Sequence, residues 1–277
     1  LAGRVIVREN DTLKSETVTS DYFVTVPSLA VHMNRGVNDG FSVNPQLDLQ
    51  PLVGAASAGL TMDALLQKVA GEEVLSHDLY LVNADAPYTF GVNDEFLASP
   101  RIDNLTSVYA SLQAFLAHEE KSGICMLACM NNEEVGSLSH QGADGDFLET
   151  TLRRIAYAFR FDDSEFYKAL ASSFLLSVDN AHSVHPNHPE TADPTNRTVM
   201  GGGVVIKSHA GGAYITDATS SAVVKTVLQK AGVPCQPFAN NSSVRSGATL
   251  GCAVVRHLGI RGADVGIAQL AMHSANE

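Results

Sequence analysis

The stretch Asn131-Asn132-Glu133-Glu134-Val135-Gly136-Ser137 decides how the rest of the chain is interpreted. It follows the apolar run 124–130, which is too short for a helix and predicts a buried strand. Two adjacent carboxylates at the end of such a strand need a metal ion or another charged partner if they point into the protein. Taken alone, the pair is more often a solvated acidic turn, so the metal interpretation depends on the rest of the chain.

The composition is that of a globular protein without a membrane span. The chain has 277 residues, of which 45% are hydrophobic and 17% are charged. No apolar run reaches the ~18 to 20 residues that a transmembrane helix needs, which predicts a soluble protein with no membrane partner. The net charge of -12 argues against nucleic acid as a partner, because nucleic-acid binding depends on Lys and Arg side chains that neutralise phosphates.

The four cysteines form no CxxC pair and no dense framework, which favours the cytoplasm. Cys125 and Cys129 lie four residues apart on the predicted strand, so we expect both to be buried thiols on one face. The first residue is not methionine, and both ends have the pattern of interrupted elements. We therefore expect the chain to continue in both directions, and the absence of a targeting segment carries no information.

Residues 1–83 have the pattern of a β-rich module. Short strands are predicted over 4–7, 15–18, 22–26 and 74–82, and a helix over 57–71 that Gly71 ends. His32 is the one residue of this module that we single out as a candidate functional group.

From Ala84 onward, strands alternate with helices, which predicts a three-layer α/β sandwich with a mostly parallel mixed sheet. The predicted helices cover 105–120, 144–161, 217–231 and 249–258, and the predicted strands cover 124–130, 174–178, 203–207 and 263–267. Asp217 is the expected cap of the third helix, while Gly232 and Gly259 follow the ends of the third and fourth.

Acidic and histidine side chains recur just after these strands. They are Asp103, Glu133, Glu134, Asp179 and His273. In open α/β sheets the carboxyl ends of the strands form the crevice that holds ligands. Carboxylate and imidazole ligands suit zinc and its first-row neighbours, and a carboxylate can bridge two ions that activate one water for peptide hydrolysis. One glutamate of an adjacent pair can then act as the general base while the other binds metal.

The sequence resembles the aspartyl aminopeptidase family of dinuclear zinc exopeptidases. The resemblance runs through almost the whole chain and is carried, in this order, by residues 1–5, 26–35, 100–105, 132–137, 177–187, 205–207 and 269–274. It implies that residues 1–83 are part of an assembly and dimerisation domain. Residues 84–277 would be part of the zinc-peptidase catalytic domain.

The resemblance implies a role for each residue of the zinc site. Asp103 would bridge two zinc ions, with Co²⁺ or Mn²⁺ as alternatives to zinc. Glu134 and His273 would be the other ligands of one ion, and Asp179 would bind the second ion. Glu133 would be the general base.

The resemblance also implies the substrate and the assembly. His182, Lys207 and Tyr214 would line a pocket for peptides with an N-terminal Asp or Glu, and Lys207 would pair with the acidic side chain. His32 would be lent to the site of a neighbouring subunit, in a homo-oligomer that is a dodecamer in the family.

Two departures from the family pattern bear on activity. A further zinc-binding histidine of the family precedes the residues present here, and a helix follows them. We therefore expect the 277-residue chain to bind one ion better than two and to be a weak peptidase. The alternatives are a related dinuclear zinc hydrolase, namely another aminopeptidase or a deacylase, and a non-catalytic assembly scaffold.

Two other patterns are rejected as functional motifs. His182, His185 and His188 recur every three residues, but Pro186 and Pro189 interrupt any helix there. The glycines at 201–203 precede Lys207 without the spacing of a phosphate-binding loop.

Overall fold

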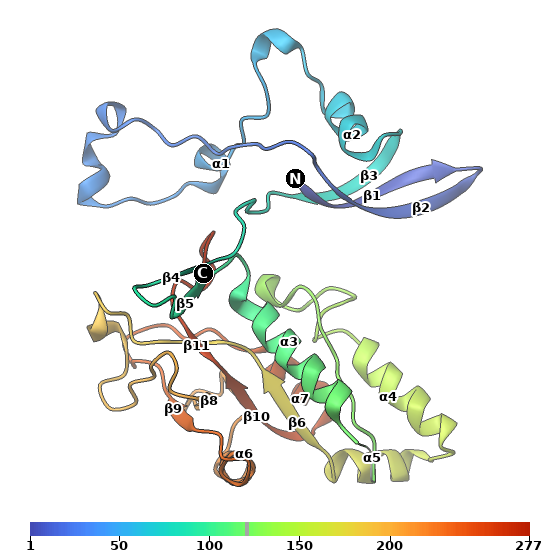
Figure 1. The fold of residues 1–277 in the computed structure, drawn as a ribbon. Coiled ribbons are helices and arrows are strands. Elements are labelled where there is room, and N and C mark those ends of the chain that lie inside the picture. Colours follow the sequence, from blue (N-terminus) through green and yellow to red (C-terminus); the bar gives the residue numbers. More distant parts are fainter. Residues whose placement is uncertain (120–121) are drawn as a thin grey trace. The chain divides into compact units, whose positions relative to one another are not determined.

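The structure is a computed structural model that describes residues 1–119 and 122–277. The chain divides into two compact units, Leu1–Ala86 and Pro87–Glu277, and each is described by itself (Figure 1). Among the described residues, no helix is both long and apolar enough to cross a bilayer.

The first unit is built on an antiparallel sheet with the strand order β2-β1-β3. These strands are β1 (Ala2–Glu9), β2 (Thr12–Thr19) and β3 (Val74–Tyr80). Asn10 and Asp11 both have positive φ, as a two-residue hairpin turn between twisted strands requires. Helix α2 (Met62–Ala70) contacts β2 and β3, and its Leu65 and Leu66 are buried. The remaining elements are η1 (Val31–Met33), η2 (Arg35–Asp39), α1 (Pro45–Asp48) and η3 (Ala56–Ala58).

Two predictions for the first unit need correction. The strand predicted over 22–26 is absent except for an isolated bridge between Thr25 and Leu52, because a strand persists only where successive residues find partners. The helix predicted from residue 57 begins only at Met62, where the Thr61 hydroxyl accepts the N–H of Ala64. Gly71 ends this helix in the left-handed conformation, as predicted.

The second unit contains a mixed sheet with the strand order β6-β10-β8-β9. Its strands are β6 (Phe174–Val178), β8 (Val204–Lys207), β9 (Cys235–Phe238) and β10 (Arg261–Gly266). The pairs β6–β10 and β8–β9 are parallel, and β10–β8 is antiparallel. The predicted α/β fold with a mostly parallel mixed sheet is confirmed.

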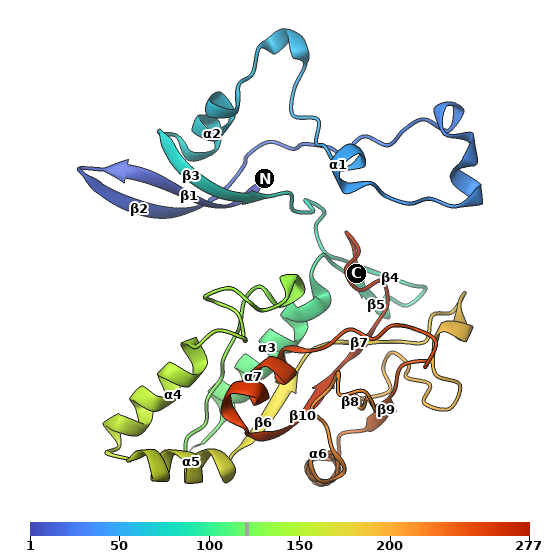
Figure 2. The same ribbon diagram turned by 180° about the vertical axis from the view of Figure 1, so that it is seen from behind.

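Helices cover both faces of this sheet, because successive residues of β10 point to opposite sides. Ala263 and Val265 pack with Val224 of helix α6 (Ala218–Lys230). Between them, Asp264 accepts a hydrogen bond from Thr249, which precedes helix α7 (Leu250–Leu258). Figure 2 shows α7 beside β6 and β10. A Cβ at Gly251 would lie 2.8 Å from the Ser177 hydroxyl, so only glycine lets α7 approach this close.

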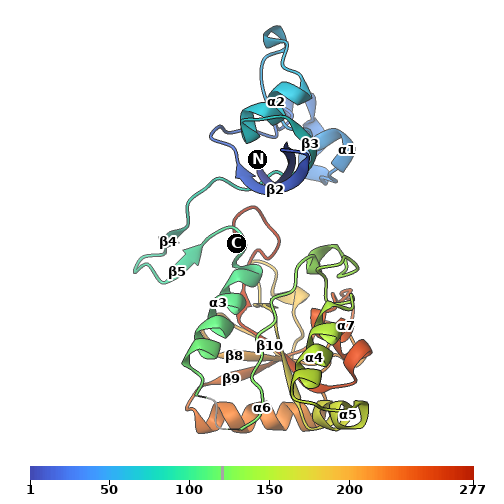
Figure 3. The ribbon, with the colours of Figure 1, turned by 90° about the vertical axis from the view of Figure 1, so that its right-hand side faces the viewer.

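The layer on the α7 side continues into helices α4 (Phe147–Ala158) and α5 (Asp163–Ala171) through one apolar core. Figure 3 shows helix α3 (Ile102–Ala117) on one side of the strands and α4 with α7 on the other. The other elements of this unit are β4 (Tyr88–Phe90), β5 (Phe96–Ala98), η4 (Glu133–Val135), β7 (Ala181–His182), η5 (Pro189–Thr191) and β11 (Ala268–Gln269).

The prediction of a strand over 124–130 is wrong. No strand is assigned there, and within the described part of the chain the run has no ladder with a neighbour. Cys125 and Cys129, predicted to be buried, are exposed. Helix α5 and strands β4, β5 and β9 were not predicted.

Several predicted helix boundaries hold and others shift. Asp217 caps α6, and Gly259 ends α7 with a φ of 60°. The helix predicted over 144–161 spans only Phe147–Ala158. The regular part of α3 starts at Leu105, as predicted, because Asp103 and Asn104 do not have helical backbone angles. The predicted end of this helix, Glu120, lies outside the described residues.

Candidate metal centre

Asp103 lies at the start of α3, where the backbone departs from helical geometry. Arg101 adopts the left-handed conformation, and Asp103 has a φ of -80° and a ψ of 111°. The Asp103 side chain is only 3% exposed, and its Oδ1 atom has no hydrogen-bond partner in the structure. A buried carboxylate oxygen without a partner is costly unless a cation binds it.

The turn that carries Glu133 and Glu134 is shaped by its neighbours. Asn132 and Gly136 both have positive φ, at 59° and 99°, and enclose the single turn of η4. The N–H groups of Gly136 and Ser137 donate to the carbonyls of Glu133 and Asn132, each at 2.9 Å. The turn therefore presents two adjacent carboxylates, with Glu133 half-buried and Glu134 exposed.

His273 comes from the segment that follows β11. Strand β11 pairs in parallel with β7, which follows β6 in the chain. The segment after β11 therefore lies near Asp179, the residue that directly follows β6. His273 itself has a φ of 65°, and the N–H of Ser274 donates to the carbonyl of Ala271 at 3.0 Å. This tight turn brings the imidazole towards α3.

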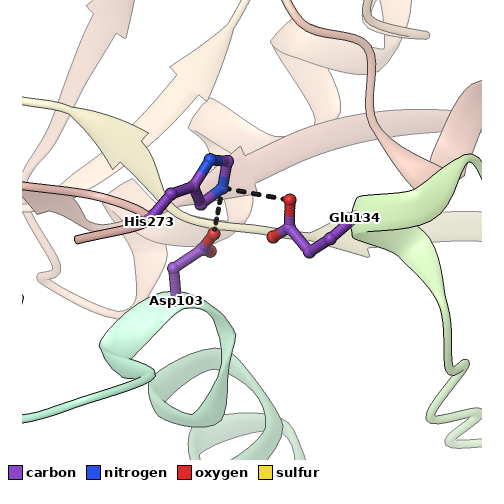
Figure 4. Close-up of side chains that lie close together, drawn as sticks. All are labelled: Asp103, Glu134 and His273. Carbon is purple, nitrogen blue, oxygen red and sulfur yellow. Dashed lines mark hydrogen bonds and ion pairs between the residues drawn. The ribbon is translucent and has the colours of Figure 1, made fainter. Parts of the chain in front are cut away.

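Three side chains from distant parts of the chain meet at one point. The Nε2 atom of His273 lies 3.1 Å from Asp103 Oδ2 and 3.1 Å from Glu134 Oε2 (Figure 4). One potential ligand atom from each residue lies within 4.8 Å of the others. Two carboxylate oxygens and one imidazole nitrogen at this spacing can bind a single divalent cation.

The pKa values around this point reflect crowded negative charge. Burial raises the pKa of Asp103 to about 7, and the charges of Asp179 and Glu134 add to the effect. The pKa of Glu133 is also raised to about 7, by burial and then by the same two carboxylates. Carboxyls that repel each other in this way are stabilised by a bound cation.

A second group lies beside the first. Lys207, at the end of β8, is 3% exposed, and its Nζ atom lies 3.0 Å from Asp179 Oδ2. The same Nζ lies 5.4 Å from the centre of the Tyr214 ring. Because Val178, Val265 and Ile206 are aligned on neighbouring strands, Asp179 emerges next to β8 and its lysine.

Both groups face one cavity of about 700 Å³. Its wall includes every site residue predicted for the second unit, namely Asp103, Glu133, Glu134, Asp179, His182, Lys207, Tyr214 and His273. His32, the remaining predicted residue, lies in the first unit on the exposed turn η1. Its role stays a prediction.

Comparison with known proteins assigns the chain to a family. The family model described as aminopeptidase I zinc metalloprotease (M18) matches residues 1–277. The chain belongs to the M18 family. A probable M18 family aminopeptidase 2 of Clostridium acetobutylicum is 40% identical over 287 aligned residues. This alignment covers 100% of the chain and 66% of that relative, so the chain spans slightly less than two thirds of the relative's length.

The fold also matches solved structures. A chain of the cryo-EM structure of the Ape4 and Nbr1 complex matches with a TM-score of 0.87 and 29% identity, over 100% of this chain and 58% of that one. The structure of the S. cerevisiae mApe1 dodecamer matches with a TM-score of 0.78 and 26% identity, over 99% and 63%.

The M18 site fits the zinc that its family description names. Asp103 presents a buried oxygen without a partner, and Glu134 and His273 add the mixed oxygen and nitrogen donors that zinc accepts. Charged carboxylates that crowd one point also favour a cation there.

One residue of this M18 site was not predicted. Glu277 accepts hydrogen bonds from the backbone N–H groups of both Asp103 and His273. Nothing local marks it, because a single glutamate four residues after a histidine is common. Only the fold shows that it lies between Asp103 and His273.

The stability of the metal-free M18 chain should depend on pH through these groups. In the unfolded chain Asp and Glu lose their protons near pH 4, whereas folded Asp103 and Glu133 keep theirs to about 7. The folded state therefore binds more protons across this interval, and the stabilisation is lost as pH rises through about 7. The raised pKa of His273 acts in the same direction.

We expect the melting temperature of the metal-free protein to fall between pH 5.5 and 7.5, and added zinc to restore it at pH 7.5. Calorimetry at several pH values tests this, with the Asp103→Asn, Glu133→Gln double variant as the control that flattens the profile. A melting temperature that rises over the same pH interval in the metal-free protein would contradict the raised pKa values of Asp103 and Glu133.

Proposed function

We propose that the protein is a zinc-dependent aminopeptidase that removes N-terminal Asp or Glu from peptides. The observation that carries this proposal is the convergence of Asp103, Glu134 and His273 at one point, with Glu133 beside them in the same cavity. Membership of the M18 family supports the reaction class. The acidic preference rests on the buried cation Lys207 in the cavity wall.

We further propose that the site would hold two metal ions, with Asp103 as a ligand that both would share. Its Oδ2 atom faces Glu134 and His273, whereas its buried Oδ1 atom has no partner in the structure and can serve a second ion. Asp179 is close enough for its charge to raise the pKa of Asp103, which supports its role at that second ion. Zinc is the expected metal, with Co²⁺ or Mn²⁺ as substitutes.

The mechanism assigns the proton transfers to Glu133. Bound zinc supplies Lewis acidity, which polarises the scissile carbonyl and lowers the pKa of water. Glu133 accepts the proton of the attacking water and then delivers it to the leaving amine. Its pKa of about 7 in the metal-free chain, caused by burial and nearby carboxylates, suits a group that must both take and release a proton near neutral pH.

Lys207 is the proposed partner of the acidic substrate side chain. A buried ammonium group requires an anion, and in this structure Asp179 provides it. An ammonium has three donors, so Lys207 can keep one contact with Asp179 and offer another to a substrate carboxylate. The Tyr214 ring beneath Nζ restricts its position, and His182 contributes to the same wall.

Replacing Lys207 with alanine should raise KM for substrates with N-terminal Asp or Glu by about 10- to 100-fold, the equivalent of about 1.5 to 3 kcal/mol for a hydrogen bond to a charged group. KM for neutral substrates should change much less. Steady-state kinetics with paired acidic and neutral aminoacyl substrates tests this. Lys225→Ala, an exposed lysine on α6, is the matched control. Equal changes for both substrate classes would remove Lys207 from specificity.

The reaction class is tested with a panel of aminoacyl anilides and N-acyl amino acids, with zinc or cobalt present. Cleavage of Asp and Glu anilides in preference to the rest supports the proposal. Cleavage of N-acyl amino acids would identify a deacylase instead, and no hydrolysis of either class would favour a scaffold.

We also propose that the protein forms a homo-oligomer, as the S. cerevisiae mApe1 dodecamer does. The first unit supports this, because Phe23, Met33 and Leu47 are large apolar side chains that are at least 73% exposed. His32, next to Met33, could then reach a neighbouring subunit. Light scattering coupled to gel filtration gives the mass, and a monomer at micromolar concentration would contradict the proposal. The cytoplasmic location remains a prediction from the cysteine pattern.

A further inference from the structure

The carboxylate of Glu277 receives the backbone N–H groups of two proposed metal ligands. The N–H of Asp103 donates to Oε2 at 2.6 Å, and the N–H of His273 donates to Oε1 at 2.8 Å. Each oxygen of one carboxylate therefore holds the main chain of a different ligand. Hydrogen bonds to a charged acceptor are the stronger class in proteins.

Glu277 is itself anchored. Its backbone N–H and carbonyl both pair with Ser99, each at 2.9 Å, just before the segment that leads into α3. Its Oε2 atom also accepts a hydrogen bond from the amide of Gln269 at 3.4 Å. The carboxylate is thus fixed at a defined distance from both ligands.

Gln269 connects this carboxylate to the strand that carries Asp179. The Gln269 Oε1 atom accepts a hydrogen bond of 2.6 Å from Asn180, and both side chains are buried. Asn180 also donates to the carbonyl of Ile102, directly before Asp103, and accepts from Ser107. The three segments that carry Asp103, Asp179 and His273 are therefore tied together beneath the metal-binding atoms.

We propose that Glu277 is a positioning residue that sets the separation of Asp103 and His273 and so determines metal affinity. This inference rests on the proposed metal centre. The physical reason is geometric: a metal accepts ligands only at defined distances and angles, and Asp103 and His273 come from segments 170 residues apart. Without the shared acceptor, each ligand would have to be ordered by the metal itself.

Two substitutions separate position from charge. Glu277→Gln keeps the shape but places an amide donor against one of the two N–H groups, so one ligand loses its acceptor. Glu277→Asp keeps the charge but is shorter by one methylene and cannot reach both N–H groups. If Glu277 acts by position, both variants should bind Co²⁺ about 10- to 100-fold more weakly, the cost typical of an outer-shell partner.

The test is a Co²⁺ titration of the purified protein, read by calorimetry and by the visible absorption of the bound ion. Melting temperatures of the metal-free variants are measured alongside, and Glu72→Gln, an exposed glutamate of the first unit, is the matched control. Weaker binding and an altered spectrum in both variants support the inference. Wild-type affinity in Glu277→Asp would show that charge alone matters, and wild-type affinity in both would overturn the role. If one variant does not fold, the other decides by the same criterion.

The result is separable from the proposed function, because metal binding is measured without substrate. A wild-type protein that binds Co²⁺ tightly but hydrolyses no aminoacyl anilide would contradict the peptidase proposal and leave the role of Glu277 intact. Glu277 variants that hydrolyse the anilides and bind Co²⁺ with wild-type affinity would contradict the role of Glu277 and leave the peptidase proposal intact.

Discussion

Replacing Glu133 with glutamine should lower kcat by about 10²- to 10⁴-fold, the range that a general base contributes. Glutamine has the size of glutamate but cannot accept a proton from water at neutral pH. Glu133 is half-buried at the wall of the cavity and is not one of the three residues that converge on the proposed metal point. The metal content should therefore stay at the wild-type level, as measured by atomic absorption on the same sample.

The control for this variant is Glu73→Gln, which removes one exposed negative charge in the first unit. It should leave both kcat and metal content unchanged. A Glu133→Gln protein with full activity would exclude Glu133 as the base. Lost activity together with lost metal would instead place Glu133 among the ligands.

Replacing His273 with alanine should have the largest effect on metal binding. His273 provides the nitrogen donor of the group, and its Nε2 atom lies between the two carboxylates. Its removal takes away the imidazole that contacts both Asp103 and Glu134, so repulsion between the two carboxylates adds to the lost ligand. Affinity should fall by more than the roughly 10- to 100-fold that loss of an outer-shell partner costs.

His188→Ala is the matched control, since that histidine is exposed, forms an ion pair with the exposed Glu190 and has its ring 5.4 Å from that of His185. Competition with a chromophoric chelator measures both affinities. Equal zinc affinity in wild type and His273→Ala would place the metal elsewhere.

The parts of the fold that sequence could predict are those with a local signal. Helices α6 and α7 carry a capping aspartate or a terminal glycine, and strand β6 is a compact apolar run. Helix α5 also had a signal that was overlooked, because Asp162 and Glu165 form a capping box. Strand β9 had no such signal, since it is short and contains Pro237.

The run 124–130 shows where local reasoning fails. Its apolar pattern favours a strand, yet a strand also needs a neighbour with matching hydrogen bonds, and pattern alone does not supply one. The burial of Cys125 and Cys129 was inferred from the same strand and failed with it.

The candidate site was predictable as a set of residue types but not as a geometry. Asp103 and His273 are separated by 170 residues, so no spacing rule brings them together. Their assignment came from the resemblance to a family, and the structure adds the distances between them. Glu277 and Asn180 were not singled out, because their importance lies in hydrogen bonds to groups from distant segments of the chain.

We expect a divalent ion to bind where Asp103, Glu134 and His273 meet. X-ray data collected above and below the zinc absorption edge, on crystals grown with zinc, test it most directly. We predict an anomalous peak within bonding distance of Asp103 Oδ2, Glu134 Oε2 and His273 Nε2, and a weaker second peak near Asp103 Oδ1 and Asp179, because we expect this chain to bind one ion better than two. A crystal that contains zinc but has no anomalous peak at the meeting point of the three side chains would contradict the account.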